Sequence, residues 1–141
     1  PNFALAAIKG LSHIAPRLPV LTLHNKDFTR DPVELARLES DPLIAKESQP
    51  AATVAALVRA DERLRQSFET ITIPVLILHG TADKATVCHG SEFFHEHAGS
   101  ADKTLKLYEG HYHDLLADTG REGVLADILG WIEARLPARA A

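Results

Sequence analysis

The second half of the chain predicts an α/β fold with a mainly parallel sheet, and three observations support that class. The apolar run "ITIPVLILHG" (71–80) is rich in Ile, Val and Leu and ends in a turn, as is typical of a strand that a parallel sheet buries on both faces. A second strand pattern, "KTLKLY", occupies 103–108, and a helical pattern follows each strand. The order strand, helix, strand, helix predicts a βαβα unit with a parallel crossover over 71–141.

The first 70 residues predict a mostly helical segment. Its first helix is expected to bury one apolar face, formed at helical spacing by Phe3, Ala7, Leu11 and Ile14. The stretch "APRLP" ends this helix, and 20–25 is predicted as extended or loop.

The next helix has a clear start signal in "DPVELARLES". Asp31 is predicted as the N-cap, Pro32 as the first helical residue, and Glu34 as the partner that closes a capping box. A longer helix is predicted over 51–68, with an apolar face made of Val54, Leu57, Val58, Leu64 and Phe68.

The two helices of the βαβα unit are predicted at 87–98, closed by Gly99, and from a capping box of Thr119 and Glu122 to the break at Pro137. Two parallel strands do not form a stable sheet by themselves. We therefore expect either further strands in sequence outside this chain or an additional strand within 18–25.

Composition narrows the function classes. The chain has 141 residues, 45% hydrophobic and 24% charged, which suits one soluble domain with a core. A net charge of −4 without runs of Lys or Arg disfavours nucleic-acid binding. Cys88 is the only cysteine, so a disulfide framework and a multi-thiolate zinc site are excluded, and a reducing, cytoplasmic location is expected. No apolar run is long enough to span a bilayer, and "PNFALAAIKG" is unlike a signal peptide.

Candidate catalytic side chains follow both predicted strands. Asp83 comes shortly after the first strand and His113 shortly after the second. Because the carboxyl ends of neighbouring parallel strands meet at one edge of a sheet, we expect these two side chains to lie together. A carboxylate that accepts a hydrogen bond from an imidazole fixes its tautomer and stabilises the imidazolium, as in the back half of a catalytic triad. The chain order Asp then His is the order of the α/β-hydrolase fold.

Simpler interpretations stand beside this one. His113 could be an ordinary loop histidine, and Asp83 a turn residue that pairs with Lys84 at the surface. His111 and His113 could form part of a metal site, although zinc needs three or four placed ligands. Cys88 could be a reactive thiol if a helix N-terminus lowers its pKa.

Two segments carry a specific resemblance. "IPVLILHGTADKAT" and "KTLKLYEGHYHDLL" resemble the C-terminal half of monoacylglycerol lipase-like α/β-hydrolases, a group that includes lysophospholipases and related carboxylesterases. The resemblance implies that Asp83 in "HGTAD" is the acidic triad member and that His113 in "GHYH" is the base, with Asp114 where the family usually has Glu. It implies a structural role for His79. The stretches "TRDP" and "SDPL" resemble the family's cap region, so the resemblance covers essentially the whole chain and is strongest over 71–136.

The family's nucleophile has no counterpart in this sequence. The resemblance implies a serine in a Gly-x-Ser-x-Gly pentapeptide at a strand-to-helix turn, and none of the six serines has those flanking glycines. Ser91, which follows Gly90, is the nearest, but it lies inside a predicted helix. We therefore expect the chain to carry the acid and the base, and to work with a missing N-terminal part of the same hydrolase.

The sequence thus predicts an α/β-hydrolase with a helical cap segment (1–70) and the C-terminal βαβα portion of the core (71–141). The expected activity is hydrolysis of monoacylglycerol- or lysophospholipid-like esters, without cofactor or metal. The apolar face of the first helix is compatible with transient contact with a membrane surface, and with simple packing. Two alternatives stay open: a non-serine nucleophile, as in a dehalogenase or an epoxide hydrolase, and a non-catalytic α/β module.

Overall fold

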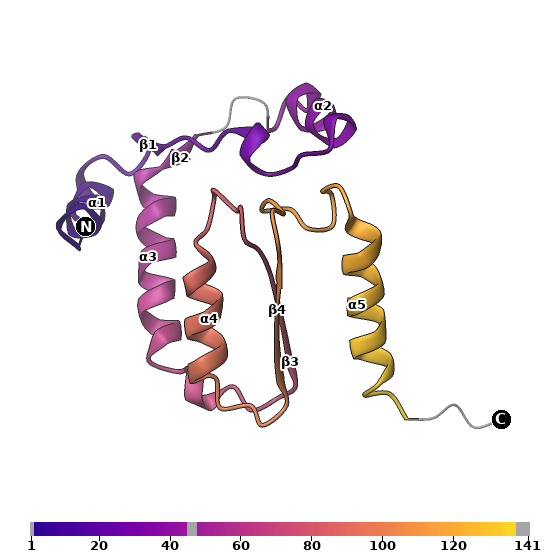
Figure 1. Ribbon diagram of the computed structural model, residues 1–141. Coiled ribbons are helices and arrows are strands. Elements are labelled where there is room, and N and C mark those ends of the chain that lie inside the picture. Colours follow the sequence, from indigo (N-terminus) through magenta and orange to yellow (C-terminus); the bar gives the residue numbers. More distant parts are fainter. Residues whose placement is uncertain (1, 45–47, 138–141) are drawn as a thin grey trace.

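The computed structural model describes residues 2–44 and 48–137 (Figure 1). Its helices and 3-10 turns are α1 (Asn2–Ile14), η1 (Asn25–Asp27), α2 (Pro32–Ser40), α3 (Ala51–Arg65), η2 (Phe68–Thr70), α4 (Cys88–His97) and α5 (Arg121–Glu133). Its strands are β1 (Pro19–Leu21), β2 (Gln49–Pro50), β3 (Val75–Gly80) and β4 (Lys103–Tyr108). The predicted order of strand, helix, strand, helix in the second half is confirmed.

Strands β3 and β4 pair in parallel, from Val75 opposite Lys103 to Gly80 opposite Tyr108. Helix α4 connects them and packs on one face, while α5 covers the other (Figure 1). Alternation along β4 explains both contacts, because successive side chains point to opposite faces. Lys103 donates from Nζ to the carbonyls of Glu96 and Ala98, at the end of α4, whereas the next residue, Thr104, accepts from Nε1 of Trp131 in α5. The two strands end at the same edge, where the candidate site lies.

The additional strand anticipated within 18–25 exists, but it does not extend this sheet. Strand β1 pairs with β2 in an antiparallel ladder inside the cap segment. Within 2–44 and 48–137 the parallel sheet therefore has two strands.

The described part of residues 1–70, the predicted cap segment, is mostly helical, but its first helix buries a different face from the one predicted. Helix α1 packs against α3 (Figure 1), yet Phe3 and Ile14 are 76% and 86% exposed, so the predicted buried face is wrong at both ends. Lys9 lies between these positions and forms an ion pair with Glu62 of α3, with Nζ and Oε1 2.7 Å apart. The half-buried side chains of α1 include Ala4, Ile8 and Leu11, so the face of α1 that meets α3 is a neighbour of the predicted one.

Helix α3 also buries a different set from the one predicted. Its buried residues are Ala51 and Ala55, whereas Leu57 and Leu64 are exposed. The helix ends at Arg65 rather than at Phe68, which lies in η2 with its ring 4.8 Å from that of Phe94. The small side chains of Ala51 and Ala55 let the neighbouring segments approach the backbone of α3 closely, and the larger Leu57 and Leu64 lie on its exposed face.

One predicted helix start is confirmed and the other is wrong. Asp31 caps α2 by accepting from the N–H groups of Val33 and Glu34, and Pro32 is the first helical residue. The reciprocal half of that box is absent, since the N–H of Asp31 donates to Thr29 and Glu34 pairs with Arg37.

Helix α5 has no capping box. Its N-cap is Gly120, with a φ of 88° and no side-chain cap. The N–H of Thr119, the predicted cap, instead donates to Asp118 over 2.9 Å. A left-handed turn that glycine adopts readily replaces the side-chain cap here.

The chain leaves much apolar surface uncovered. Its accessible area is 9576 Å², whereas a compact monomer of 15.4 kDa exposes about 7,200 Å². Among the described helices, none combines the length and hydropathy needed to cross a membrane.

Candidate active site

The ends of β3 and β4 bring the two predicted catalytic residues together. Nδ1 of His113 lies 2.8 Å from Oδ2 of Asp83, although the two residues are 30 positions apart. The loops that carry them are joined by backbone hydrogen bonds, from the N–H of Thr81 to Tyr108 and from the N–H of Ala82 to His111. The parallel register therefore places the acid against the imidazole.

Asp83 is an almost fully enclosed carboxylate, with its side chain 3% exposed. Its oxygens accept from the N–H groups of Ala85 and Thr86, from the Thr86 hydroxyl and from His113, over 2.7 to 3.0 Å. Burial acts to raise the pKa of Asp83, but the hydrogen bonds from Thr86, His113 and Ala85 outweigh it and lower that pKa to about 2. The carboxylate is therefore charged at neutral pH and can stabilise a positive imidazole.

His113 is the more accessible member of the pair. Its side chain is 36% exposed, and the ring of Phe28 packs against it edge-on at 5.1 Å between centroids. Since an ionised Asp83 only accepts hydrogen bonds, Nδ1 of His113 must donate. That assignment leaves Nε2 as the nitrogen able to take a proton from a nucleophile.

The close approach of the two loops depends on Gly80. A Cβ built at this position would lie 2.3 Å from the carbonyl oxygen of His111 and 2.5 Å from that of Tyr112. Only a residue without a side chain lets β3 end directly under the backbone that precedes His113.

His79 lies on the other side of Asp83. Its Nε2 is 3.1 Å from Oδ2 of Asp83, and its Nδ1 is 2.7 Å from the hydroxyl of Ser91 in α4. His79, predicted to be structural, thus lies between Asp83 and α4, and its buried Nε2 has no hydrogen-bond partner among the described residues. The contact also places the Ser91 hydroxyl against His79 rather than against His113.

The simpler interpretations of this region find little support. Lys84 pairs with Asp27, at 3.4 Å, rather than with Asp83. Burial raises the pKa of the Cys88 thiol, and so do the nearby carboxylates of Glu92, Asp83 and Glu109, which is the opposite of activation by a helix N-terminus.

The two histidines of "GHYH" do not converge on a common point. His113 faces Asp83, whereas Nδ1 of His111 is 3.9 Å from Oδ2 of Asp118. In the part of the chain that the structure describes, no three His, Cys, Asp or Glu side chains are grouped to hold a metal ion.

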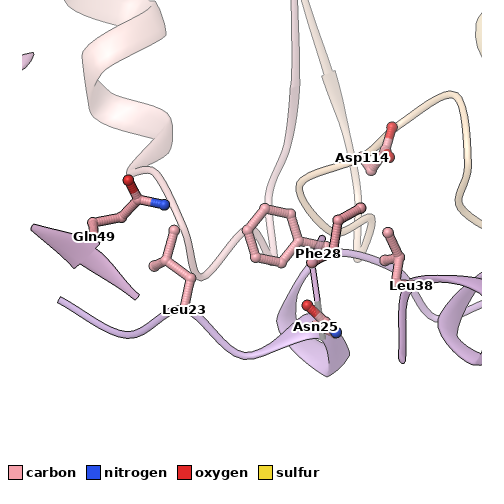
Figure 2. Close-up of a pocket in the computed structure, with 7 residues that line it drawn as sticks. Leu23, Asn25, Phe28, Leu38, Gln49 and Asp114 are labelled. Carbon is pink, nitrogen blue, oxygen red and sulfur yellow. The ribbon is translucent and has the colours of Figure 1, made fainter. Parts of the chain in front are cut away.

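A pocket of about 330 Å³ opens between the cap segment and the His113 loop (Figure 2). Cap residues supply most of the wall and Asp114 the rest; the lining is Leu23, Asn25, Phe28, Leu38, Ile44, Gln49 and Asp114. Phe28 contacts both this pocket and the His113 ring, so the pocket adjoins the site.

One buried acidic residue beside the site, Asp118, is not among the residues predicted from the sequence. Asp118 is 0% exposed and accepts from the N–H of Tyr112, the residue before His113. Nothing local distinguishes it, because an aspartate before Thr-Gly is typical of an ordinary turn. Its main partner, Arg30, is 88 residues away.

Known proteins are similar to this chain over nearly its whole length. Residues 1–120 match the family described as serine aminopeptidase, S33. The chain belongs to that family. S33 relatives include a caffeoylshikimate esterase of Arabidopsis thaliana, 35% identical over 95% of this chain and 41% of that protein. A monoacylglycerol lipase of Mycolicibacterium smegmatis is 31% identical over 94% of this chain and 47% of that protein.

Solved structures of S33-like hydrolases confirm the predicted fold. The crystal structure of Paleococcus ferrophilus monoacylglycerol lipase matches with a TM-score of 0.81 at 31% identity, over 94% of this chain and 52% of that one. A soluble variant of Saccharomyces cerevisiae monoglyceride lipase, solved with a substrate analogue, also matches with a TM-score of 0.81. The match has 26% identity and covers 96% of this chain and 48% of that one. The chain is thus a monoacylglycerol lipase-like α/β-hydrolase that spans about half the length of these relatives.

Proposed function

We propose that the protein containing this chain is a serine hydrolase that cleaves monoacylglycerol- or lysophospholipid-like esters. The observation that carries the proposal is the 2.8 Å contact between Nδ1 of His113 and the buried carboxylate of Asp83 at the ends of two parallel strands. In the mechanism, a serine outside residues 1–141 attacks the ester carbonyl. Nε2 of His113 accepts the serine proton and then gives it to the leaving alcohol.

Asp83 acts through His113 and not on the substrate. Its charge stabilises the imidazolium, and its fixed position keeps the proton on Nδ1. Water then attacks the acyl-serine by the same route, with His113 again as the base, and the fatty acid leaves. Every proton in this cycle passes through Nε2 of His113.

The pocket supports a lipid ester as the substrate. Four apolar side chains, Leu23, Phe28, Leu38 and Ile44, suit hydrocarbon, and three polar residues, Asn25, Gln49 and Asp114, suit hydroxyl groups. Monoacylglycerol has both parts. The names of the relatives, which include monoglyceride lipases, point to the same class.

In the proposed domain organisation, residues 1–70 form a cap and residues 71–141 belong to the catalytic core. Helices α1, α2 and α3 make up most of the first part, and β3, α4, β4 and α5 the second. The uncovered apolar surface supports a further part of the same protein that packs on this chain and supplies the nucleophile and the remaining strands.

A panel of substrates distinguishes a serine esterase from a dehalogenase or an epoxide hydrolase. The full protein would be assayed for fatty-acid release from monoacylglycerol and lysophosphatidylcholine, for halide release from a haloalkane, and for diol formation from an epoxide. We expect turnover of the esters only, abolished by His113→Ala and retained in His89→Ala, which removes an exposed histidine of α4. Halide or diol formation would indicate a carboxylate nucleophile, and equal turnover by the His113→Ala variant would contradict a catalytic role for that residue.

A further inference from the structure

Three consecutive residues of the cap segment, Phe28, Thr29 and Arg30, run against the loop that carries His113. We call them the cap strap. The strap makes backbone, hydroxyl and guanidinium contacts with residues 114–119. No residue of the strap belongs to the Asp83–His113 pair.

Asp118 is the anchor of this contact. Its buried carboxylate accepts from the N–H and Nε of Arg30, at 2.7 and 2.8 Å, and from the N–H groups of Tyr112 and Thr119, at 3.0 and 2.9 Å. Burial acts to raise the pKa of Asp118, and the bonds from Tyr112, Arg30 and Thr119 lower it. A buried carboxylate that is charged needs a partner of opposite charge, and Arg30 is that partner.

The strap fixes the backbone on both sides of His113. On one side, the N–H of Tyr112 is held by Asp118, which Arg30 holds in turn. On the other side, the N–H of Asp114 donates to the carbonyl of Phe28 over 2.8 Å. A third bond, from the Thr29 hydroxyl to the carbonyl of Ala117, closes the far end of the loop.

The His113 ring has few other supports. Besides Asp83, it contacts the Phe28 ring of the strap, and its Nδ1 is 3.5 Å from the Thr86 hydroxyl. A ring that is 36% exposed depends on its backbone for position. Catalytic geometry tolerates displacements of only about 0.5 Å, so even a small shift of the backbone around His113 would take Nδ1 out of place against Asp83.

We propose that Arg30 and Asp118 are positioning residues, through which the cap segment holds His113 against Asp83. Neither touches the reacting atoms. The catalytic consequence rests on the proposed function, whereas the effect on the tautomer of His113 is independent of it.

The test is Arg30→Met in the full protein, with Arg37→Met as the matched control. Methionine keeps an unbranched stem as far as the position of Nε and removes the charged guanidinium. The backbone N–H of residue 30 still donates to Asp118, so three backbone donors to that carboxylate remain. Arg37 is an arginine of the same cap segment whose partner, Glu34, lies on α2 itself. ¹⁵N NMR of the imidazole nitrogens above pH 8 reports the His113 tautomer.

We expect Nδ1–H alone in the wild type and in Arg37→Met, and a mixture with Nε2–H in Arg30→Met. The amide signals of β3 are expected to stay unchanged. A His113 tautomer that Arg30→Met leaves unchanged would overturn the proposal, and so would general loosening that includes β3, because Arg30 would then only stabilise the fold.

Ester turnover supplies a second readout. A base displaced by about 1 Å lowers kcat by about 100-fold, and KM should change little because neither Arg30 nor Asp118 lines the substrate pocket. Arg30→Lys should recover part of the loss by restoring the charge. If the wild type cleaves no ester, the proposed function fails, and the tautomer measurement alone decides the role of the strap.

Discussion

At the residue scale, the site depends on how a single carboxylate is surrounded. Asp83 receives two backbone N–H groups, a hydroxyl and an imidazole, and has almost no contact with solvent. This environment keeps Asp83 ionised and holds the proton of His113 on Nδ1.

The first prediction concerns catalysis. Asp83→Asn removes the charge and presents an amide to Nδ1, so His113 loses its tautomer and the stabilisation of its imidazolium. We expect kcat for ester hydrolysis to fall by roughly 10³- to 10⁴-fold, with KM nearly unchanged, in steady-state assays. Asp27→Asn, which removes the surface partner of Lys84, should behave as the wild type. A tenfold or smaller loss in Asp83→Asn would contradict the assigned role.

The second prediction concerns stability in acid. The pKa of Asp83 is about 2 in the folded chain, against an ordinary value of 3.8. Because the folded pKa is the lower one, the ionised carboxylate stabilises the fold above about pH 4, and this contribution is lost as pH falls through about 2. It amounts to on the order of 2 kcal/mol at pH 7.

Denaturant unfolding at pH 7 and pH 3 measures this contribution. We expect the difference in unfolding free energy between wild type and Asp83→Asn to shrink by about half at pH 3. A difference that does not change with pH would show that the pKa of Asp83 is not depressed.

At the element scale, the site depends on how closely β3 approaches the His113 loop. Gly80→Ala places a methyl group against backbone oxygens that have no flexible end to move aside. We expect the Gly80→Ala variant to lose about 1–3 kcal/mol of stability. Its activity should fall further than that of other variants with the same loss of stability, because the His113 loop moves away from Asp83.

Gly130→Ala in α5 is the matched control. Nothing lies within 4 Å of a Cβ at this position, and replacing a mid-helix glycine raises stability by about 0.5–1 kcal/mol. Thermal unfolding of both variants measures the contrast. Equal behaviour of the two would mean that the close approach at Gly80 has no structural consequence.

Elements with strong local patterns could be predicted from the sequence, and long-range pairings could not. Apolar runs and the strand-end rule were enough to place β3 and β4 and to bring Asp83 and His113 together. The rotation of α1 was missed because it depends on packing against α3, a helix that begins 37 residues after α1 ends. The strap was missed for the same reason, since the pattern around Asp118 is that of a turn and its partner Arg30 lies in the cap segment.

At the scale of the whole molecule, the accessible surface exceeds that of a compact monomer of the same mass. The excess area and the two-stranded parallel sheet both favour packing against a further part of the protein. We expect residues 1–141, expressed separately, to unfold at lower denaturant and with less cooperativity than the full protein. Circular dichroism in urea measures this. A transition as sharp and as late as that of the full protein would show that the exposed faces need no cover.

The central claim is that Asp83 and His113 activate a serine, and covalent labelling tests it most directly. The full protein would be treated with a fluorophosphonate, which reacts with activated serines, and its intact mass would be measured. We expect one adduct per molecule, lost in His113→Ala, strongly slowed in Asp83→Asn and unaffected in His89→Ala. Absence of an adduct in the wild type, or equal labelling of the His113→Ala variant, would contradict the claim.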